Sequence, residues 1–159
     1  MEVTMKGKPL KLVGNPPKLG DKAPDCELIT MDLKKVQVAD YRPAILSCVP
    51  SLDTSTCSIQ TRRFLQEVER RGVQLVTISM DLPFAQKRWC GAEGAANATV
   101  LSDHREAAFG RAFGILIPSL RLLARTVFVV DANGVIRYVQ VVPEISEEPD
   151  YASALAACK

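Results

Sequence analysis

Short apolar runs alternate with longer amphipathic segments along this chain, and this pattern predicts strands separated by helices. The apolar runs that predict buried strands are Ala44–Val49, Val73–Met80, Thr99–Ser102 and Thr126–Val130. The segments with helical spacing are Ser58–Arg71, Pro83–Cys90, His104–Phe113 and Asp150–Cys158. Strands that alternate with helices indicate an α/β domain whose central sheet is flanked by helices on both faces.

Hairpin signals near both ends of the chain add antiparallel pairs to this picture. Val3–Gly14 alternates around a Gly-Lys-Pro turn and predicts an N-terminal β-hairpin, and Cys26–Val38 predicts two short strands. The Asp-Ala-Asn-Gly turn at 131–134 joins the last apolar run to a final strand over Val135–Val142. The central sheet is therefore expected to be mixed. A thioredoxin-like strand order fits this pattern, and periodicity alone leaves a flavodoxin-like order open.

Length and composition fit one domain that spans residues 1–159. Hydrophobic residues make up 47% of the chain and charged residues 24%, as in ordinary folded domains. The 20 Lys and Arg residues nearly balance the 18 Asp and Glu residues, which argues against a nucleic-acid partner. Apolar runs stay shorter than the roughly 20 residues that a membrane helix needs, so no membrane association is expected. The first residues include an early glutamate and no apolar signal segment, and a cytoplasmic location is expected.

Five cysteines and a single histidine are the unusual chemistry of the sequence. They form no Cys-x-x-Cys pair, so neither a zinc or iron–sulfur site nor a cofactor is expected. Cysteines of a cytoplasmic protein stay reduced unless they are catalytic or redox-sensing. We expect Cys26 and Cys48 to be buried small hydrophobes and Cys158 to be exposed without a role. His104 is expected at the surface or as a helix cap.

The segment from Pro50 to Cys57 follows a predicted strand and precedes a predicted helix. Cys57 is expected in the first turn of this helix, where unpaired backbone N–H groups and the helix dipole favour an anion. A thiolate is such an anion, so this position predicts a reactive cysteine. Thr54 can place its hydroxyl beside the sulfur, and Pro50 can close the loop over it.

Helical geometry places this cysteine on the face of the helix that carries the core contacts. At about 100° per residue, Thr61, Phe64, Leu65 and Val68 share that face with Cys57. The sulfur is therefore expected to be partly sheltered and rigidly held, at the mouth of a pocket.

Cys57 and Arg63 also have the Cys-x5-Arg spacing of cysteine-dependent phosphatases. That chemistry needs a loop of inward-pointing N–H groups around a phosphate, with the arginine reaching back to it. The five residues between the two contain no glycine, and on a helix Arg63 points about 120° away from Cys57. A phosphatase is therefore the remote alternative.

A motif around the same cysteine resembles the active site of the peroxiredoxins. Pro50, Thr54 and Cys57 match the family pattern Pro-x-x-x-Thr-x-x-Cys. The longer string Val-Pro-Ser-Leu-Asp-Thr resembles the bacterial thiol peroxidase branch, which is of the atypical two-cysteine type. Ser55 stands where the family often has proline or glycine, which loosens one backbone restraint and leaves the motif intact.

The resemblance extends over essentially the whole chain. Asp81–Gly94 is similar to the segment that holds the resolving cysteine of this branch, which corresponds to Cys90. The Leu-Ala-Arg run that ends at Arg125 resembles the position of the active-site arginine of the family. Because Arg111 and Arg121 are nearby, this arginine assignment depends on the resemblance.

The resemblance implies a thioredoxin-like fold and thiol-dependent reduction of hydrogen peroxide and alkyl hydroperoxides. The Cys57 thiolate would become a sulfenic acid, while Thr54, the Cys57 N–H and Arg125 hold the peroxide. Cys90 would then close an intrachain disulfide with Cys57, and thioredoxin would restore both thiols. The branch also implies a homodimer. A peroxide sensor that passes its disulfide to a partner protein would use the same residues, and the sequence leaves this alternative open.

Overall fold

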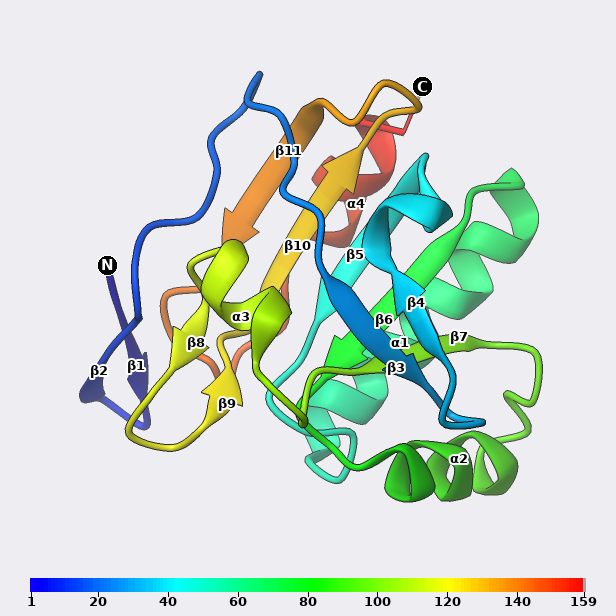
Figure 1. The fold of residues 1–159 in the computed structure, drawn as a ribbon, viewed down its shortest axis with the longest axis horizontal. Helices are drawn as coiled ribbons and strands as arrows, with labels where there is room; N and C mark the ends of the chain where they lie inside the picture. The colour runs from blue at the N-terminus through cyan, green and yellow to red at the C-terminus, as the bar shows by residue number, and fades with distance from the viewer. Residues whose placement is uncertain (159) are drawn as a thin grey trace.

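The computed structural model describes residues 1–158, and a seven-stranded sheet forms its centre (Figure 1). Its strand order is β11-β10-β5-β6-β7-β3-β4. The strands are β3 (Glu27–Thr30), β4 (Lys35–Gln37), β5 (Ala44–Cys48), β6 (Leu75–Ser79), β7 (Thr99–Ser102), β10 (Thr126–Val130) and β11 (Ile136–Val141). β5, β6 and β7 run parallel to one another, and the remaining pairs of this sheet are antiparallel. The predicted mixed sheet is confirmed, and its antiparallel β10 makes the order thioredoxin-like rather than flavodoxin-like.

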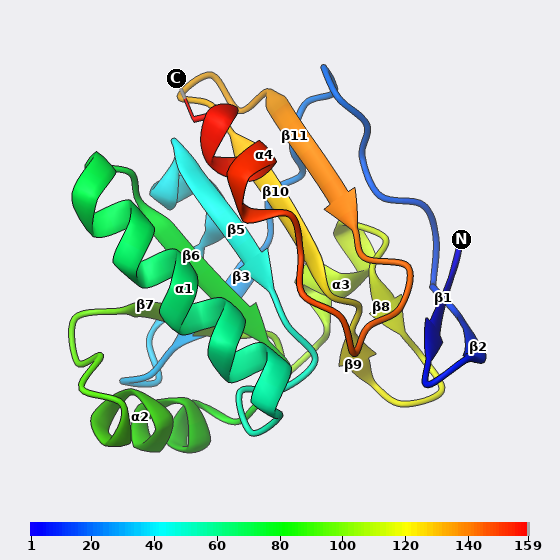
Figure 2. The same ribbon diagram turned by 180° about the vertical axis from the view of Figure 1, so that it is seen from behind.

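Helices cover both faces of this sheet, as predicted. α1 (Ser55–Arg71) and α4 (Tyr151–Ala156) lie on one face, which Figure 2 shows from the front. α3 (Ala108–Ala112) lies over the other face with the short pair β8 (Leu116–Ile117) and β9 (Leu122–Leu123). α2 (Pro83–Ala92) lies beside one end of the sheet, and the 3-10 helix η1 (Val38–Tyr41) follows β4. Within residues 1–158, no helix combines the length and apolar character that crossing a bilayer requires.

Successive side chains of the central strands enter two separate apolar clusters. Ile45 of β5 shares one cluster with Phe64 of α1. Its neighbour Leu46 points to the opposite face, where it shares a cluster with Phe109 and Phe113. The rings of this phenylalanine pair are stacked, with centroids 4.1 Å apart. The sheet is therefore buried on both faces, and it gives a rigid platform to the loops at its ends.

The register between β5 and β10 decides which residues meet at one end of the sheet. Thr126 lies opposite Cys48 in this antiparallel pair. Cys48 is the last residue of β5, so the chain leaves the sheet there toward Pro50 and α1. Arg125 immediately precedes β10. The segment that leads from β5 to α1 and the segment that contains Arg125 are distant in the sequence, and each carries predicted site residues. Both therefore lie at the same end of the sheet.

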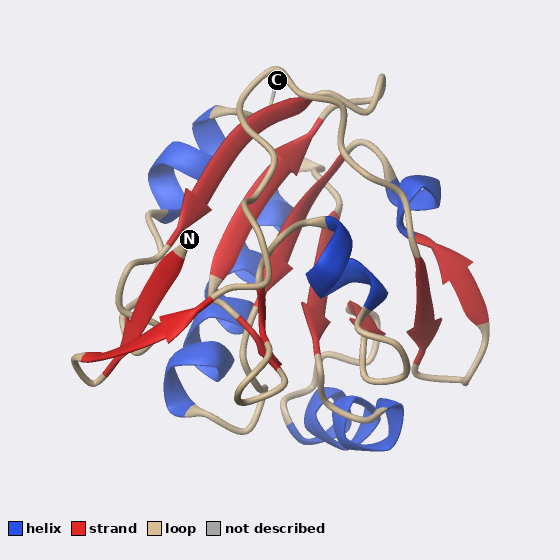
Figure 3. Ribbon diagram, turned by 60° about the vertical axis from the view of Figure 1, so that its left-hand side comes forward, coloured by secondary structure: helices blue, strands red, loops and turns tan. Residues whose placement is uncertain are grey.

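The predicted N-terminal hairpin is confirmed as β1 (Glu2–Met5) and β2 (Lys8–Lys11), which lie outside the main sheet (Figure 3). Thr4 connects this hairpin to the segment after β11. Its N–H donates to the carbonyl oxygen of Pro143 at 2.7 Å, and its carbonyl oxygen accepts the N–H of Ile145 at 2.9 Å. The hairpin therefore holds the backbone of residues 143–145.

The first long helix starts earlier than predicted. α1 begins at Ser55 rather than Ser58, because the Thr54 hydroxyl oxygen accepts the backbone N–H of Cys57 at 3.3 Å. A side chain that accepts such an N–H is a favourable N-cap. The cap places Cys57 in the first turn, as the sequence analysis expected.

Two other helices also differ from their predicted extents. α3 is shorter, because the Asp103 carboxylate accepts the N–H groups of Phe109 and Gly110 and so starts the helix later. α2 is longer and ends at Ala92, two residues beyond Cys90. The last helix is confirmed over the shorter span of α4. The sequence pattern did not indicate β8 and β9, whose two-residue strands are too short to show alternation.

Candidate active site

Cys57 lies at the end of a short capped loop. Its backbone N–H donates to Thr54 Oγ1 at 3.3 Å, and the Thr54 hydroxyl donates to the carbonyl oxygen of Ser51 at 3.2 Å. Pro50 is buried at the start of this loop. The first turn of α1 leaves N–H groups without helical partners, and the helix dipole adds positive potential there. Both effects favour a negatively charged group at this position.

Arg125 lies against the same sulfur, with its Nη2 atom 3.3 Å from Cys57 Sγ. Only 2% of the arginine is exposed, so its charge needs close partners. Nη1 donates to Gln60 Oε1 and Nε donates to the carbonyl oxygen of Ile145, each at 2.8 Å. These two oxygens are neutral. The thiolate of Cys57 can therefore supply the negative charge that balances the buried guanidinium.

The other arginines that the sequence offered as candidates do not lie beside the sulfur of Cys57. Arg111 and Arg121 are exposed, and both are close enough to Asp103 to act on its carboxylate. Arg63 places its guanidinium 4.7 Å from the centre of the Tyr151 ring, which directs it toward α4. The structure therefore contradicts a phosphate-binding loop formed by Cys57 and Arg63.

Gln60 contacts the arginine and is itself held by Ser47, and the sequence pattern indicated neither residue. Each side chain is fully buried. Gln60 Nε2 donates to Ser47 Oγ at 2.7 Å, while its Oε1 accepts from Arg125. The amide is thus fixed at both ends and orients the guanidinium toward Cys57. The sequence feature that could have identified Gln60 as a site residue is its position, one turn after Cys57 on the same face of α1.

Cys90 of α2 shares a small apolar cluster with Cys57. The other buried members of this cluster are Val49, Leu52, Trp89 and Val100. Cys90 is only 2% exposed, and burial raises the pKa of its thiol. Both cysteines are free thiols in this structure. The structure therefore brings the predicted redox pair into one region, with Cys90 in surroundings that favour its protonated form.

The sulfur of Cys57 is more enclosed than expected. Its side chain is 0% exposed, so the prediction of a partly sheltered sulfur at the mouth of a pocket is wrong. Val49, Leu52 and Trp89 belong to its cluster and exclude solvent. Exclusion of water lowers the effective dielectric constant, so the nearby guanidinium acts more strongly on the sulfur.

The three remaining cysteines lie away from this cluster. Cys48 is fully buried in the cluster on the α3 face, and burial raises the pKa of its thiol. Cys26 is half-buried at the margin of the same cluster, and burial raises its pKa to about 12. Cys158 was expected to be exposed, which is wrong. It is half-buried, and its thiol donates to the carbonyl oxygen of Ala154 at 3.4 Å.

A thioredoxin-like sheet with a cysteine in the first turn of α1 and a buried arginine beside its sulfur defines a peroxiredoxin-type oxidoreductase. Comparison with known proteins agrees with this class. The chain belongs to the Redoxin family, whose sequence profile matches residues 18–155.

Relatives of the chain match it along nearly its full length. A thiol peroxidase of Listeria innocua is 52% identical over 161 residues, covering 99% of this chain and 98% of that protein. A thiol peroxidase of Bacillus subtilis is 48% identical and covers 99% of this chain and 96% of that protein. The crystal structure of a peroxiredoxin-like protein from Aquifex aeolicus is 41% identical, with a TM-score of 0.89 over 98% of this chain and 94% of that one.

Proposed function

We propose that this chain is a thiol peroxidase in which Cys57 reduces hydrogen peroxide and alkyl hydroperoxides, and in which Cys90 resolves the oxidised product. Full-length identity of 52% and 48% to two thiol peroxidases supports the peroxidase activity. The observation that carries the residue assignment is the 3.3 Å contact between Arg125 Nη2 and Cys57 Sγ in a fully buried site.

In the first step, the Cys57 thiolate attacks one oxygen of the peroxide. The O–O bond breaks, the sulfur becomes a sulfenic acid, and the second oxygen leaves as hydroxide or alkoxide and takes up a proton. Arg125 stabilises the thiolate beforehand and the charge on the departing oxygen as it forms. Thr54 Oγ1 and the Cys57 N–H, which already contact each other, can contribute polar contacts to the peroxide.

In the second step, the sulfur of Cys90 attacks the sulfenic sulfur of Cys57. An intrachain disulfide forms, and the hydroxyl group leaves with the thiol proton as water. A dithiol protein of the thioredoxin type would then reduce the disulfide by exchange. No metal or cofactor takes part in this sequence of steps.

The proposed setting of this enzyme is the bacterial cytoplasm. Its matched relatives are bacterial, and a cycle that returns both cysteines to thiols suits a reducing compartment. A homodimer is proposed on the same family grounds.

The test is steady-state peroxide consumption with thioredoxin and its reductase. Cys57→Ser should abolish turnover, whereas Cys26→Ser, a matched change at a half-buried cysteine outside the cluster, should retain it. Turnover by the Cys57→Ser variant would refute the proposal.

The alternative is a peroxide sensor that passes its disulfide to a partner protein, because such a sensor would use the same two cysteines. A single stoichiometric reaction without turnover would favour it. Peptide mapping of the oxidised protein tests the pairing itself. A disulfide between Cys57 and Cys90 supports the assignment, and a link from Cys57 to Cys48 or to a second subunit would overturn it.

A further inference from the structure

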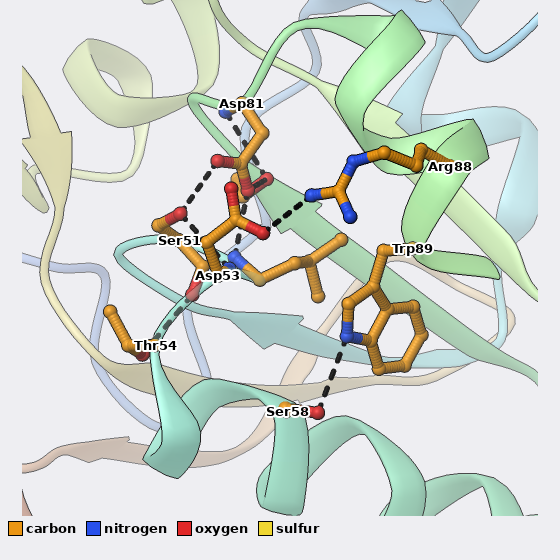
Figure 4. A network of polar contacts seen from close by, with 9 residues as sticks. Ser51, Asp53, Thr54, Ser58, Asp81, Arg88 and Trp89 are labelled. Atoms are coloured by element: carbon orange, nitrogen blue, oxygen red, sulfur yellow. Dashed lines mark hydrogen bonds and ion pairs between the residues drawn. The ribbon is translucent and has the colours of Figure 1, made fainter. Parts of the chain in front are cut away.

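Two side-chain contacts join the segment that carries the peroxidatic cysteine to α2 (Figure 4). Arg88 Nη2 donates to Asp53 Oδ1 at 2.7 Å, in an ion pair whose side chains are 64% and 63% exposed. Trp89 Nε1 donates to Ser58 Oγ at 3.3 Å, and this indole is 5% exposed. We call these two contacts the α1–α2 clasp.

The clasp connects the two redox cysteines through their neighbours in the sequence. Ser58 directly follows Cys57, and Trp89 directly precedes Cys90. A hydrogen bond weakens steeply when its atoms move apart or lose alignment. The clasp therefore restrains how far the backbones at the two cysteines can shift relative to each other.

The start of α2 is held by a separate set of contacts. Asp81, just before the helix, accepts the Ser51 hydroxyl at 2.7 Å and the Leu52 N–H at 2.8 Å. Gln86 is fully buried and donates to the carbonyl oxygen of Leu101 at 2.9 Å. These contacts tie the first half of the helix to the active-site loop and to the sheet, and they do not involve the C-terminal half of the helix.

The end of α2 is packed more loosely. Residues 91–94 are exposed, and a cavity of about 410 Å³ lies between α1 and residues 93–98. Arg62 and Glu93 span this region in a longer ion pair, with 3.7 Å between Nη1 and Oε2. The half of α2 that carries Cys90 therefore follows an anchored first half and precedes an exposed end. The clasp fastens it to Ser58 of α1 and to Asp53 in the loop before α1.

From this arrangement we propose that Asp53, Arg88 and Ser58 are positioning residues that set how fast Cys90 reaches the oxidised Cys57. The inference rests on the proposed function. When the disulfide forms, a new S–S bond replaces the S–O bond of the sulfenic acid, and water leaves with the thiol proton of Cys90. The closed clasp holds this thiol in an apolar cluster that disfavours the attacking thiolate. Opening of the clasp therefore precedes the step and limits its rate.

Slow opening of the clasp also has a disadvantage, because the sulfenic acid on Cys57 persists longer before Cys90 reacts with it. A second peroxide can then oxidise it to the sulfinic acid, which thioredoxin does not reduce. Loosening of the clasp should therefore change two measurable quantities together. Disulfide formation becomes faster, and more peroxide is needed to inactivate the enzyme.

The test compares Arg88→Ala and Ser58→Ala with the wild type in single turnover. Reduced protein is mixed with hydrogen peroxide and quenched, and mass spectrometry follows the sulfenic acid and the disulfide. We expect disulfide formation to be about two- to five-fold faster in each variant, as suits an exposed ion pair or one neutral hydrogen bond. The rate of sulfenic acid formation should stay unchanged. The peroxide concentration that inactivates half of the protein should rise by a similar factor.

The helix itself offers a matched control. Lys87 is the neighbour of Arg88 and forms its own exposed ion pair with Asp32 at 3.7 Å, away from α1. Lys87→Ala should leave both rates unchanged. The chain also has a single tryptophan, Trp89, so its fluorescence follows the clasp directly in every variant.

A charge exchange separates the clasp from a general loss of stability. The double variant Asp53→Arg with Arg88→Asp keeps an ion pair of reversed direction, and it should return disulfide formation toward the wild-type rate. A double variant that stays as fast as Arg88→Ala would overturn the proposal. So would single variants whose disulfide forms at the wild-type rate or more slowly. These outcomes leave the proposed function intact, because the turnover of Cys57→Ser and the peptide mapping of the disulfide test that function separately.

Discussion

Arg125 and Cys57 are 68 residues apart in the sequence, yet Nη2 of the arginine lies 3.3 Å from the sulfur. The pairing of β10 with β5 produces this contact, because Arg125 enters β10 at the end of the sheet where β5 leads toward Cys57. The guanidinium is buried and bound by two further acceptors. Its charge is therefore already in place when a peroxide arrives and needs little reorganisation during the reaction.

Substitution of this arginine should reduce catalysis much more than stability. Arg125→Lys keeps the charge, but an ammonium group on a flexible stem cannot serve the three acceptors in the same geometry. We expect kcat/KM for hydrogen peroxide to fall by about 10²–10³-fold, the usual effect of losing a preorganised donor. Arg121→Lys, at an exposed position, is the control and should have wild-type activity. A loss of less than about three-fold in Arg125→Lys would contradict the assigned role.

The neutral charge of the Gln60 amide should be important for the reactivity of Cys57. In Gln60→Glu, a carboxylate would stand at 2.8 Å from Arg125 Nη1 and compete with the thiolate for the same positive charge. The rate at which iodoacetamide alkylates Cys57 at neutral pH should fall by about ten-fold, because like charges repel strongly in a buried site. Gln66→Glu, at an exposed position on the same helix, should have no effect. Equal alkylation rates in wild type and Gln60→Glu would show that the neutral amide is not required for the reactivity of Cys57.

Removal of the resolving thiol should separate the two chemical steps. Cys90→Ser should consume one equivalent of peroxide at the wild-type rate and then stop, because no disulfide forms for thioredoxin to reduce. The oxidised variant should contain a sulfenic acid on Cys57, which a dimedone probe detects. Cys48→Ser serves as the comparison and should cycle normally. Continued thioredoxin-dependent cycling of Cys90→Ser would exclude Cys90 as the resolving residue.

Acid should loosen the attachment of the N-terminal hairpin. Hydrogen bonds from Ser146 and Gly7 lower the pKa of Glu144 from 4.5 to about 2. A carboxyl group whose pKa is lowered by folding stabilises the folded state above its unfolded pKa. Its contribution disappears as the pH falls from 4.5 toward 2.

Glu144→Gln checks this pH dependence. We expect the variant to be less stable than the wild type at neutral pH, with a difference that shrinks as the pH falls through this range. Urea unfolding at several pH values measures it. Glu147→Gln, at an exposed neighbouring position, should follow the wild type at every pH. A difference that does not depend on pH would show that the carboxylate charge is not the cause.

The part of the site that could be predicted from the sequence is the part made by one segment. Thr54 and Cys57 lie three residues apart, and the rules of helix capping are enough to place them together. Arg125 joins them only through the register of β5 and β10, which periodicity does not give. Its assignment therefore required the resemblance of its surrounding residues to a known family.

Gln60 and Ser47 could not be found in this way. A glutamine on an amphipathic helix is usually exposed, and a serine in an apolar strand has no evident partner. Gln60 becomes significant only because the buried Arg125 needs an acceptor, and Ser47 only because it accepts the Nε2 end of the same amide. The full burial of Cys57 has a similar origin, since it depends on how Trp89 of α2 packs over the start of α1.

The N-terminal hairpin contributes no side chain to the site, yet it matters for any attempt to tether this protein. Thr4 fixes the backbone on both sides of Glu144, and the carbonyl oxygen of Ile145 accepts Nε of Arg125 at 2.8 Å. A fusion partner or solid support attached at the hairpin would therefore apply force to the backbone segment that positions the guanidinium of Arg125. The exposed turn at Asn133 lies at the opposite end of β10 from Cys57, and it offers an attachment point from which such a force would not reach the sulfur.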